Sequence, residues 1–279
     1  MPSLHEKVGR MLLVGFEGLE APQYILDWLA EGRIGGIILF ARNVESPRQL
    51  AELVRSLQEV SKHPPLISID QEGGIVARLR DGFSESPGAM ALGAAGSEDL
   101  AERVSHALGT ELRALGINFN LAPVVDIGHD SSNPVISTRT LGANAGQVAQ
   151  LAVAQVRGFQ SAGVGACAKH FPGHGNTPVD SHVSLPVVSG SPDFLWAHDL
   201  VPFRAVVDAG IASVMISHVK FEEIDPDYPS TMSPKIITGM LREEIGFDGL
   251  IVTDCMEMQA ITQNYGAGES AVLAALAGV

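Results

Sequence analysis

The chain has 279 residues, of which 46% are hydrophobic and 18% are charged, a composition typical of a folded domain with a substantial core. The formal net charge is −14, and the 18 lysines and arginines are scattered, which argues against a surface built to neutralise nucleic-acid phosphates. The amino end carries no signal-peptide pattern, and no apolar run approaches the roughly 20 residues that span a bilayer. We therefore expect a cytoplasmic protein without nucleic-acid or membrane partners.

Short apolar runs alternate with amphipathic segments and mark seven predicted strands. Most runs are continuously hydrophobic, which is typical of parallel strands buried on both faces. Cys167 and Cys255 fall inside two of the runs, and we interpret both as small core residues without a disulfide or a reactive thiol. In chain order the predicted strands are residues 12–16, 36–40, 66–70, 118–126, 165–171, 213–219 and 250–255.

Amphipathic helices with recognisable ends lie between these strands. The clearest start is Ser46-Pro47, which combines a capping side chain with proline at the first helical position. The other helices follow the same scheme of a polar cap, an apolar stripe and a terminal glycine. The predicted helices span residues 46–60, 97–116, 144–163 and 233–246, and a last one begins near 269 and runs through 277.

The alternation of strand and helix predicts a parallel sheet with right-handed crossovers. Seven units in this length favour a closed α/β barrel of the (β/α)8 TIM type. An open dinucleotide-binding sheet is disfavoured because the string from Val14 to Gly18 lacks the third glycine of that fingerprint. A complete barrel needs one more strand and helix. We therefore expect residues 1–279 to form a single catalytic barrel domain whose C-terminal end is cut short.

Ionisable residues stand where the predicted strands end, which is where barrels of this type place their chemistry. A single aspartate at such a point is often only a helix cap or a turn residue. Five of the seven strands, however, end in charged or titratable groups on one rim, and gathering them costs desolvation and repulsion that a structural role does not justify. The residues concerned are Asp70, Asp126, Lys169 with His170, His218 and Asp254, and Arg139 lies in the loop after the fourth strand.

The loop after the fifth predicted strand carries the densest signal, with three histidines and an aspartate between residues 169 and 182. The histidine spacing matches no usual zinc pattern, and the proline and glycine residues indicate a mobile loop, so no metal is expected. Asp180 stands two residues before His182, as in a carboxylate that orients an imidazole proton donor. We interpret His174 as a residue that packs the loop.

At these residues the chain resembles glycoside hydrolase family 3, in the β-N-acetylglucosaminidase branch that recycles bacterial cell wall. The most specific part is Lys-His-Phe-Pro-Gly-His-Gly at 169–175, followed by Asp-Ser-His at 180–182. The resemblance extends over nearly the whole chain, from Gly35 to Asp254. One departure is Ile75, where the family more often has arginine.

The resemblance implies a role for each matching residue. Asp254 matches the nucleophile that forms a covalent glycosyl-enzyme, and His182 matches the acid/base with Asp180 as its partner. Asp70 matches the carboxylate that grips sugar hydroxyls, and no cofactor is implied. Groups that hold the remaining hydroxyls and the N-acetyl substituent are matched by Arg78, Arg139, Lys169 and His170. Two further residues have more open roles: His218 contacts the sugar or caps its strand, and Met256 forms an apolar wall under the sugar or the acetyl methyl group.

The function implied is that of a retaining exo-β-N-acetylglucosaminidase acting on N-acetylglucosaminides such as muropeptide fragments. A retaining mechanism needs one group beneath the sugar and one beside the leaving oxygen, and imidazole titrates near neutrality and can fill the second position. Two alternatives remain open. One is a phosphorylase that transfers the sugar to phosphate, and the other is a catalytically silent sugar-binding protein.

Overall fold

A computed structural model describes residues 3–130, 133–177, 180–181 and 183–279 of the chain. Its centre is a seven-stranded sheet in the order β1-β2-β3-β6-β7-β9-β11, in which every neighbouring pair is parallel. All seven predicted strands are therefore confirmed, in the order of the chain. They are β1 (Leu13–Val14), β2 (Gly36–Leu39), β3 (Leu66–Ile69), β6 (Phe119–Asn120), β7 (Gly165–Phe171), β9 (Ser213–Ile216) and β11 (Leu250–Thr253).

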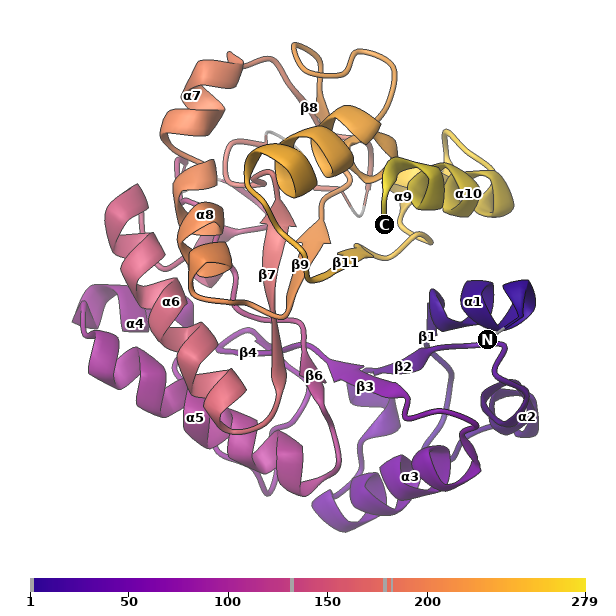
Figure 1. Ribbon diagram of the computed structural model, residues 1–279. Helices are drawn as coiled ribbons and strands as arrows, with labels where there is room; N and C mark the ends of the chain where they lie inside the picture. Colours follow the sequence, from indigo (N-terminus) through magenta and orange to yellow (C-terminus); the bar gives the residue numbers. More distant parts are fainter. Residues whose placement is uncertain (1–2, 131–132, 178–179, 182) are drawn as a thin grey trace.

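The sheet is curled into a half-barrel with helices on its outside (Figure 1). One apolar cluster collects buried side chains from β6, β7, β9 and β11, and residues of β1, β2 and β3 pack against it, so the whole sheet curves around a shared interior. In the described part of the chain no strand pairs with the outer edge of β1 or of β11. The described residues thus form a half-barrel, which fits the expected TIM-type barrel without its last strand and helix, and a full (β/α)8 barrel is not confirmed.

The helices confirm most of the predicted pattern. The side chains of Ser46, Ser97 and Asn144 each accept a hydrogen bond from a backbone N–H in the first turn and so begin α3, α5 and α6. In the described part of the chain, no helix has both the length and the apolarity to cross a bilayer. The α-helices are α1 (Leu4–Arg10), α2 (Gln23–Glu31), α3 (Pro47–Val60), α4 (Ala89–Ala95), α5 (Glu98–Ala114), α6 (Ala145–Ser161), α7 (Pro192–Ala197), α8 (Leu200–Asp208), α9 (Gln259–Thr262) and α10 (Ala267–Ala277).

Other short elements connect these helices and strands. The helix predicted at 233–246 is present as η4 (Lys235–Glu244), but its hydrogen bonds follow the wider π pattern. Two small sheets add to the carboxyl edge of the main one: β4 (Gln71–Gly73) with β5 (Val76–Ala77), antiparallel, and β8 (Val187–Val188) with β10 (Lys220–Phe221), parallel. Three short 3₁₀ turns complete the described elements: η1 (Ala41–Asn43), η2 (Ser137–Arg139) and η3 (Ser230–Met232).

Two strand ends differ from the prediction. The fourth strand leaves the regular ladder after Asn120, because Pro123 has no N–H to donate, and beyond it an isolated bridge joins Val124 to Lys169. The last strand ends at Thr253, so Cys255 lies outside the sheet and is exposed. Cys255 is therefore not a core residue, whereas Cys167 is fully buried as expected.

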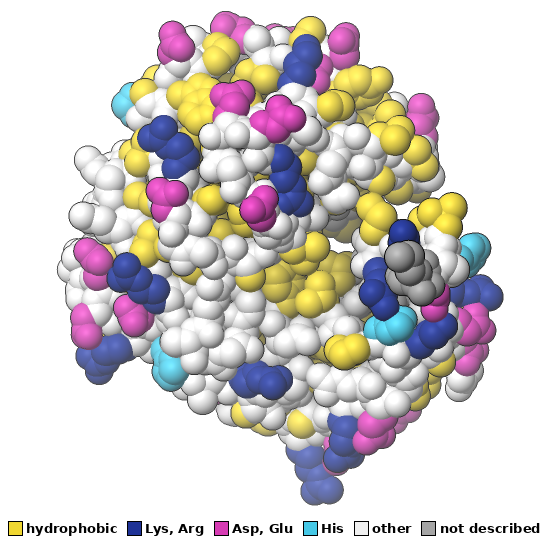
Figure 2. Space-filling model, viewed as in Figure 1, with side chains coloured by type: hydrophobic (Ala, Val, Ile, Leu, Met, Phe, Trp, Pro, Cys, Tyr) yellow, Lys and Arg dark blue, Asp and Glu magenta, His cyan; other side chains and the backbone are white. Residues whose placement is uncertain are grey.

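The surface seen in Figure 2 bears acidic and basic side chains intermixed around its outer parts, and apolar side chains in a hollow near its middle. On this face the lysines and arginines form no continuous basic patch.

Candidate active site

The site begins with two carboxylates that share one lysine. Asp70 follows β3 directly, and its Oδ1 lies 2.7 Å from Nζ of Lys169 in β7. Glu72, two residues further along the extended chain, places Oε1 at 2.7 Å from the same Nζ. Burial favours the neutral amine, but attraction to the Asp70 and Glu72 carboxylates outweighs it and raises the pKa of Lys169. All three groups are therefore charged at neutral pH.

Arg139, in the η2 turn, forms a bidentate ion pair with Glu72. Its Nε donates to Oε2 over 2.9 Å and its Nη2 to Oε1 over 2.8 Å, while its Nη1 donates to the carbonyl of Val135. Burial opposes ionisation of Glu72, but the charges of Lys169 and Arg139 lower its pKa below the ordinary value. Because Nε, Nη1 and Nη2 are all held by these contacts, the planar guanidinium has a fixed orientation, and its remaining N–H groups can donate to a ligand.

Gln71 sets the position of Arg78. Its side-chain oxygen accepts hydrogen bonds from the backbone N–H groups of Arg78 and Leu79, and its side-chain nitrogen donates to the Leu79 carbonyl. The chain is thereby folded back through the β4–β5 hairpin, and Nη2 of Arg78 comes to 3.3 Å from Oδ2 of Asp70. Burial opposes ionisation of Asp70, but Lys169 and Arg78 together lower its pKa.

His170 stands beside these ion pairs at the end of β7. Its Nδ1 is 2.7 Å from Oδ2 of Asp126, and its Nε2 is 3.4 Å from Nη2 of Arg139. Burial and the neighbouring Arg139 place the pKa of His170 well below its ordinary value, so the ring is neutral. Asp126 itself is fully buried, and this burial raises its pKa to about 6.

The start of the loop after β7 is tightly bound. His174 is buried, with Nδ1 at 2.7 Å from Oγ1 of Thr177 and Nε2 at 3.0 Å from Oγ of Ser181. The side-chain nitrogen of Asn133 donates to the carbonyls of His174, Gly175 and Thr177. The interpretation of His174 as a residue that packs the loop is confirmed.

Asp254 follows β11 at the same edge of the sheet. Its backbone N–H donates to the Ile216 carbonyl, and its Oδ1 accepts from the N–H of Cys255 over 2.7 Å. Burial opposes ionisation, but attraction to the His218 ring, the hydrogen bond from the Cys255 N–H and the charge of Lys169 lower the pKa of Asp254. The residue is an ionised carboxylate at neutral pH.

His218 lies beneath this segment and is fully buried. Its Nδ1 is 2.6 Å from Oγ1 of Thr231, and its Nε2 is 2.9 Å from the carbonyl oxygen of Cys255. The ring therefore fixes the chain directly after Asp254. Of the two roles left open for His218, this placement favours the structural one, while sugar contact stays a prediction.

The structure thus brings most of the predicted residues together. Asp180 is half-buried, and its carbonyl accepts hydrogen bonds from the N–H groups of Val183 and Ser184. Met256 is half-buried two residues after Asp254, and His182 lies outside the described residues. In the part of the chain that is described, no group of three or more His, Cys, Asp or Glu side chains is arranged to hold a metal ion. The members joined by contacts or charge are Asp70, Arg78, Arg139, Lys169, His170 and Asp254.

Two participants, Glu72 and Asp126, were not singled out as site residues from the sequence. Glu72 has a sequence signal, because residues two apart in an extended segment point to the same side, and Asp70 was already a candidate. Asp126 was counted among the charged strand ends but was given no role. Its importance depends on contacts with His170 and His174 that no local pattern shows.

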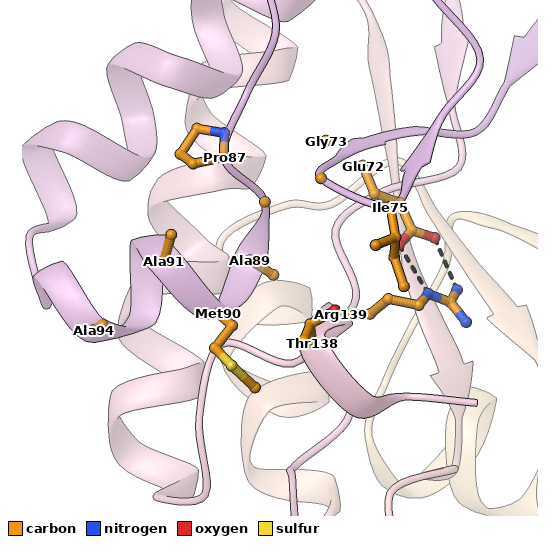
Figure 3. Close-up of a pocket in the computed structure, with 12 residues that line it drawn as sticks. Glu72, Gly73, Ile75, Pro87, Ala89, Met90, Ala91, Ala94, Thr138 and Arg139 are labelled. Atoms are coloured by element: carbon orange, nitrogen blue, oxygen red, sulfur yellow. Dashed lines mark hydrogen bonds and ion pairs between the residues drawn. The ribbon is translucent and has the colours of Figure 1, made fainter. Parts of the chain in front are cut away.

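A cavity of about 430 Å³ adjoins the ion pairs. The Glu72–Arg139 pair forms part of its wall, and Figure 3 shows Ile75 beside this pair, with Met90 and the alanines of α4 across from it. Ile75 is 65% exposed and Met90 is 48% exposed. The departure at position 75 therefore places an apolar side chain next to the charged network.

A curled parallel sheet with paired carboxylates and cations at its carboxyl edge defines the class of protein, an enzyme built on a (β/α)-barrel scaffold. Residues 3–279 match the model of the glycosyl hydrolase family 3 N terminal domain. The chain belongs to this family and is a glycoside hydrolase.

Three similar proteins illustrate the relationship. A β-hexosaminidase of Stenotrophomonas maltophilia is 39% identical over 256 residues, which are 90% of this chain and 76% of that protein. The structure of a family 3 β-N-acetylglucosaminidase from Paenibacillus sp. FPU-7 has a TM-score of 0.98 and 48% identity, over 100% of this chain and 54% of that one. The structure of NagZ from Neisseria gonorrhoeae in complex with N-trifluoroacetyl-D-glucosamine has a TM-score of 0.89 and 35% identity, over 96% of this chain and 79% of that one. The chain thus spans about half of the Paenibacillus protein.

Proposed function

We propose that the protein is a retaining exo-β-N-acetylhexosaminidase that removes terminal β-linked N-acetylglucosamine through a covalent intermediate on Asp254. The observation that carries the proposal is the position of the Asp254 carboxylate, directly after β11 at the same edge of the sheet as the Lys169 network. The names of the relatives, β-hexosaminidase and β-N-acetylglucosaminidase, support the proposal that the sugar removed is an N-acetylhexosamine.

In the first step an oxygen of Asp254 attacks the anomeric carbon, and the bond to the leaving oxygen breaks as that oxygen receives a proton. The low pKa of Asp254 keeps the attacking carboxylate unprotonated at neutral pH. His182, oriented by Asp180, supplies the proton. In the second step His182 takes a proton from water, and the water oxygen replaces Asp254 at the anomeric carbon.

The ion-pair network holds the sugar. Asp70 has its two oxygens fixed by Lys169 and Arg78, so that its remaining acceptor positions can receive sugar hydroxyls. Beside Asp70, the guanidinium of Arg139 and the imidazole of His170 lie next to each other and can also contact the sugar. Because these groups are already paired and buried, little side-chain ordering is needed on binding.

The natural substrates proposed are N-acetylglucosaminides of peptidoglycan fragments, processed in the cytoplasm, with residues 1–279 as the catalytic domain. The negative net charge disfavours polyanionic substrates and is compatible with neutral sugars.

The test is the initial rate of release from an aryl N-acetyl-β-glucosaminide, with and without phosphate, for the native protein and for Asp254→Asn. Asp248→Asn is the matched control, because Asp248 is exposed and lies before the opposite end of the same strand. We expect the Asp254 variant to lose at least about 10³-fold in rate while the control keeps the native rate. Proton NMR of the first product should show the β-anomer, as retention requires.

Other outcomes would change the assignment. An α-anomer as first product would replace the covalent mechanism with an inverting one. Strong acceleration by phosphate would make the enzyme a phosphorylase. Sugar binding with no turnover by the native protein would make it a silent binder.

A further inference from the structure

Asp126 is a buried carboxylate to which the proposed mechanism gives no task. It lies after β6 with 1% of its surface exposed. Its Oδ2 accepts hydrogen bonds from the backbone N–H of His170 over 3.0 Å and lies 2.7 Å from that residue's Nδ1. Its Oδ1 accepts from the backbone N–H of His174 over 2.6 Å. One carboxylate therefore joins the sugar-site histidine to the start of the loop that carries Asp180.

The partners of His170 determine which nitrogen carries its proton. Arg139 has donors only, so Nε2 of His170, 3.4 Å from Nη2 of Arg139, must be the acceptor. Nδ1 then carries the hydrogen and donates it to Asp126. Burial keeps the ring from taking a second proton. The Asp126 contact thus selects one neutral form of His170.

We propose that Asp126 is a positioning residue: it fixes the Nδ1–H form of His170, so that Nε2 accepts from Arg139 and holds that guanidinium in place for the sugar, and it anchors the β7 loop through His174. The part that His170 and Arg139 play in holding the sugar rests on the proposed function. The choice of proton position and the anchoring of the loop do not.

Only a carboxylate suits this position. All three partners of Asp126 are N–H donors, so the residue must act as an acceptor on both oxygens. An asparagine offers one oxygen and one NH₂ group, and the NH₂ group would face at least one N–H without an acceptor. Asp126→Asn keeps the shape while it removes this function.

The experiment compares Asp126→Asn with Asp225→Asn. Asp225 is also buried and accepts hydrogen bonds from the backbone N–H groups of Asp227 and Tyr228 and from the hydroxyl of Ser233. Within the described residues, none of these partners is a histidine. Ring nitrogen shifts are recorded on protein labelled with ¹⁵N-histidine, and the His170 signals are assigned by their loss in His170→Gln. Amide hydrogen exchange at His174 and the kinetics on an aryl N-acetyl-β-glucosaminide complete the set.

We expect native His170 to show a protonated Nδ1 and an unprotonated Nε2. In Asp126→Asn the proton should move to Nε2 or be shared, the His174 amide should exchange faster, and kcat/KM should fall by about 10- to 100-fold, as when the orienting partner of a histidine is removed. Asp225→Asn should leave the His170 shifts and the His174 exchange unchanged. Native His170 with an unprotonated Nδ1, or equal nitrogen shifts in the native protein and Asp126→Asn, would overturn the proposal. The nitrogen shifts and the amide exchange are read without substrate, so they decide it even if the hydrolysis itself is not observed.

Discussion

Arg139 and Glu72 are joined by two parallel hydrogen bonds, Nε to Oε2 and Nη2 to Oε1, at 2.9 and 2.8 Å. Glu72 also lies 2.7 Å from Nζ of Lys169, so one carboxylate holds two of the cations predicted to bind the sugar. Glu72 therefore orients the site without needing to touch the substrate itself.

Glu72→Gln should destabilise the protein and weaken sugar binding. The glutamine keeps one oxygen but leaves Arg139 and Lys169 with one anion fewer in a buried setting, which should lower the free energy of unfolding by about 3 kcal/mol. KM for an aryl N-acetyl-β-glucosaminide should rise more than kcat falls. Urea unfolding and steady-state kinetics measure both effects. The exposed substitution Glu85→Gln should change neither, and equal values for the two variants would show that Glu72 has no positioning role.

Lys169→Met should reverse the pH dependence that Asp70 and Glu72 give to stability. In the native protein their pKa values are lowered, so the stability they contribute is present above their ordinary pKa and is lost as pH falls through the lowered one. Without Lys169 the two buried carboxylates repel each other and their pKa values rise. The variant should therefore be less destabilised at about pH 5 than at about pH 8 in urea unfolding. The exposed Lys235→Met is the control, and a loss of stability that does not vary with pH would contradict the prediction.

The contribution of Asp126 to stability depends on pH in the opposite direction to that of Asp70 and Glu72. Burial raises its pKa to about 6, above the ~3.9 of an exposed aspartate. The folded protein binds this proton more tightly than the unfolded chain, so the contribution is complete below the ordinary pKa and is lost as pH rises through about 6. The native protein should lose on the order of 1 kcal/mol relative to Asp126→Asn between about pH 5 and pH 8. Denaturant titrations of both proteins at the two pH values measure this difference, and a constant difference would exclude the raised pKa.

Gly175→Ala should impair the loop after β7. A Cβ at this position would overlap the Ile127 carbonyl oxygen, so the backbone would have to move away from it. Because the neighbouring His174 carries the loop's internal hydrogen bonds, kcat should fall by at least about tenfold, a rise of about 1.4 kcal/mol in the barrier. Gly190→Ala is the matched control, since a Cβ there makes only ordinary contact with Val188. Native kinetics in Gly175→Ala would mean that the loop position does not matter for turnover.

Much of the fold follows from local pattern. The seven strands were predictable because strands buried on both faces are continuous apolar runs, and α3 because Ser46 and Pro47 mark its start. The predicted end of the fourth strand was wrong, because Pro123 interrupts the hydrogen-bond ladder inside an apolar run. The prediction that Cys255 is a core residue was wrong, because apolar character alone does not show that the sheet ends at Thr253.

The candidate site was predictable as far as it depends on strand ends. Asp70, Lys169 and Asp254 lie at one edge because parallel strands end on the same side. Glu72 and Asp126 act through partners 67 and 44 residues away in the chain, Arg139 and His170. Such pairs are formed by the curvature of the sheet, which no local spacing encodes.

The Gln71 side chain ties both stems of the β4–β5 hairpin, while Ile75 at its turn is 65% exposed. Arg78 therefore owes its place to the stems and not to the turn residue. In a protein whose exposed Cys255 is replaced by serine, a cysteine introduced at position 75 and coupled to a fluorescent dye would place a reporter on the wall of the cavity next to Glu72 and Arg139, without altering the groups that fix Arg78. The hairpin thus provides an attachment point for an optical sensor that reports whether the proposed sugar site is occupied.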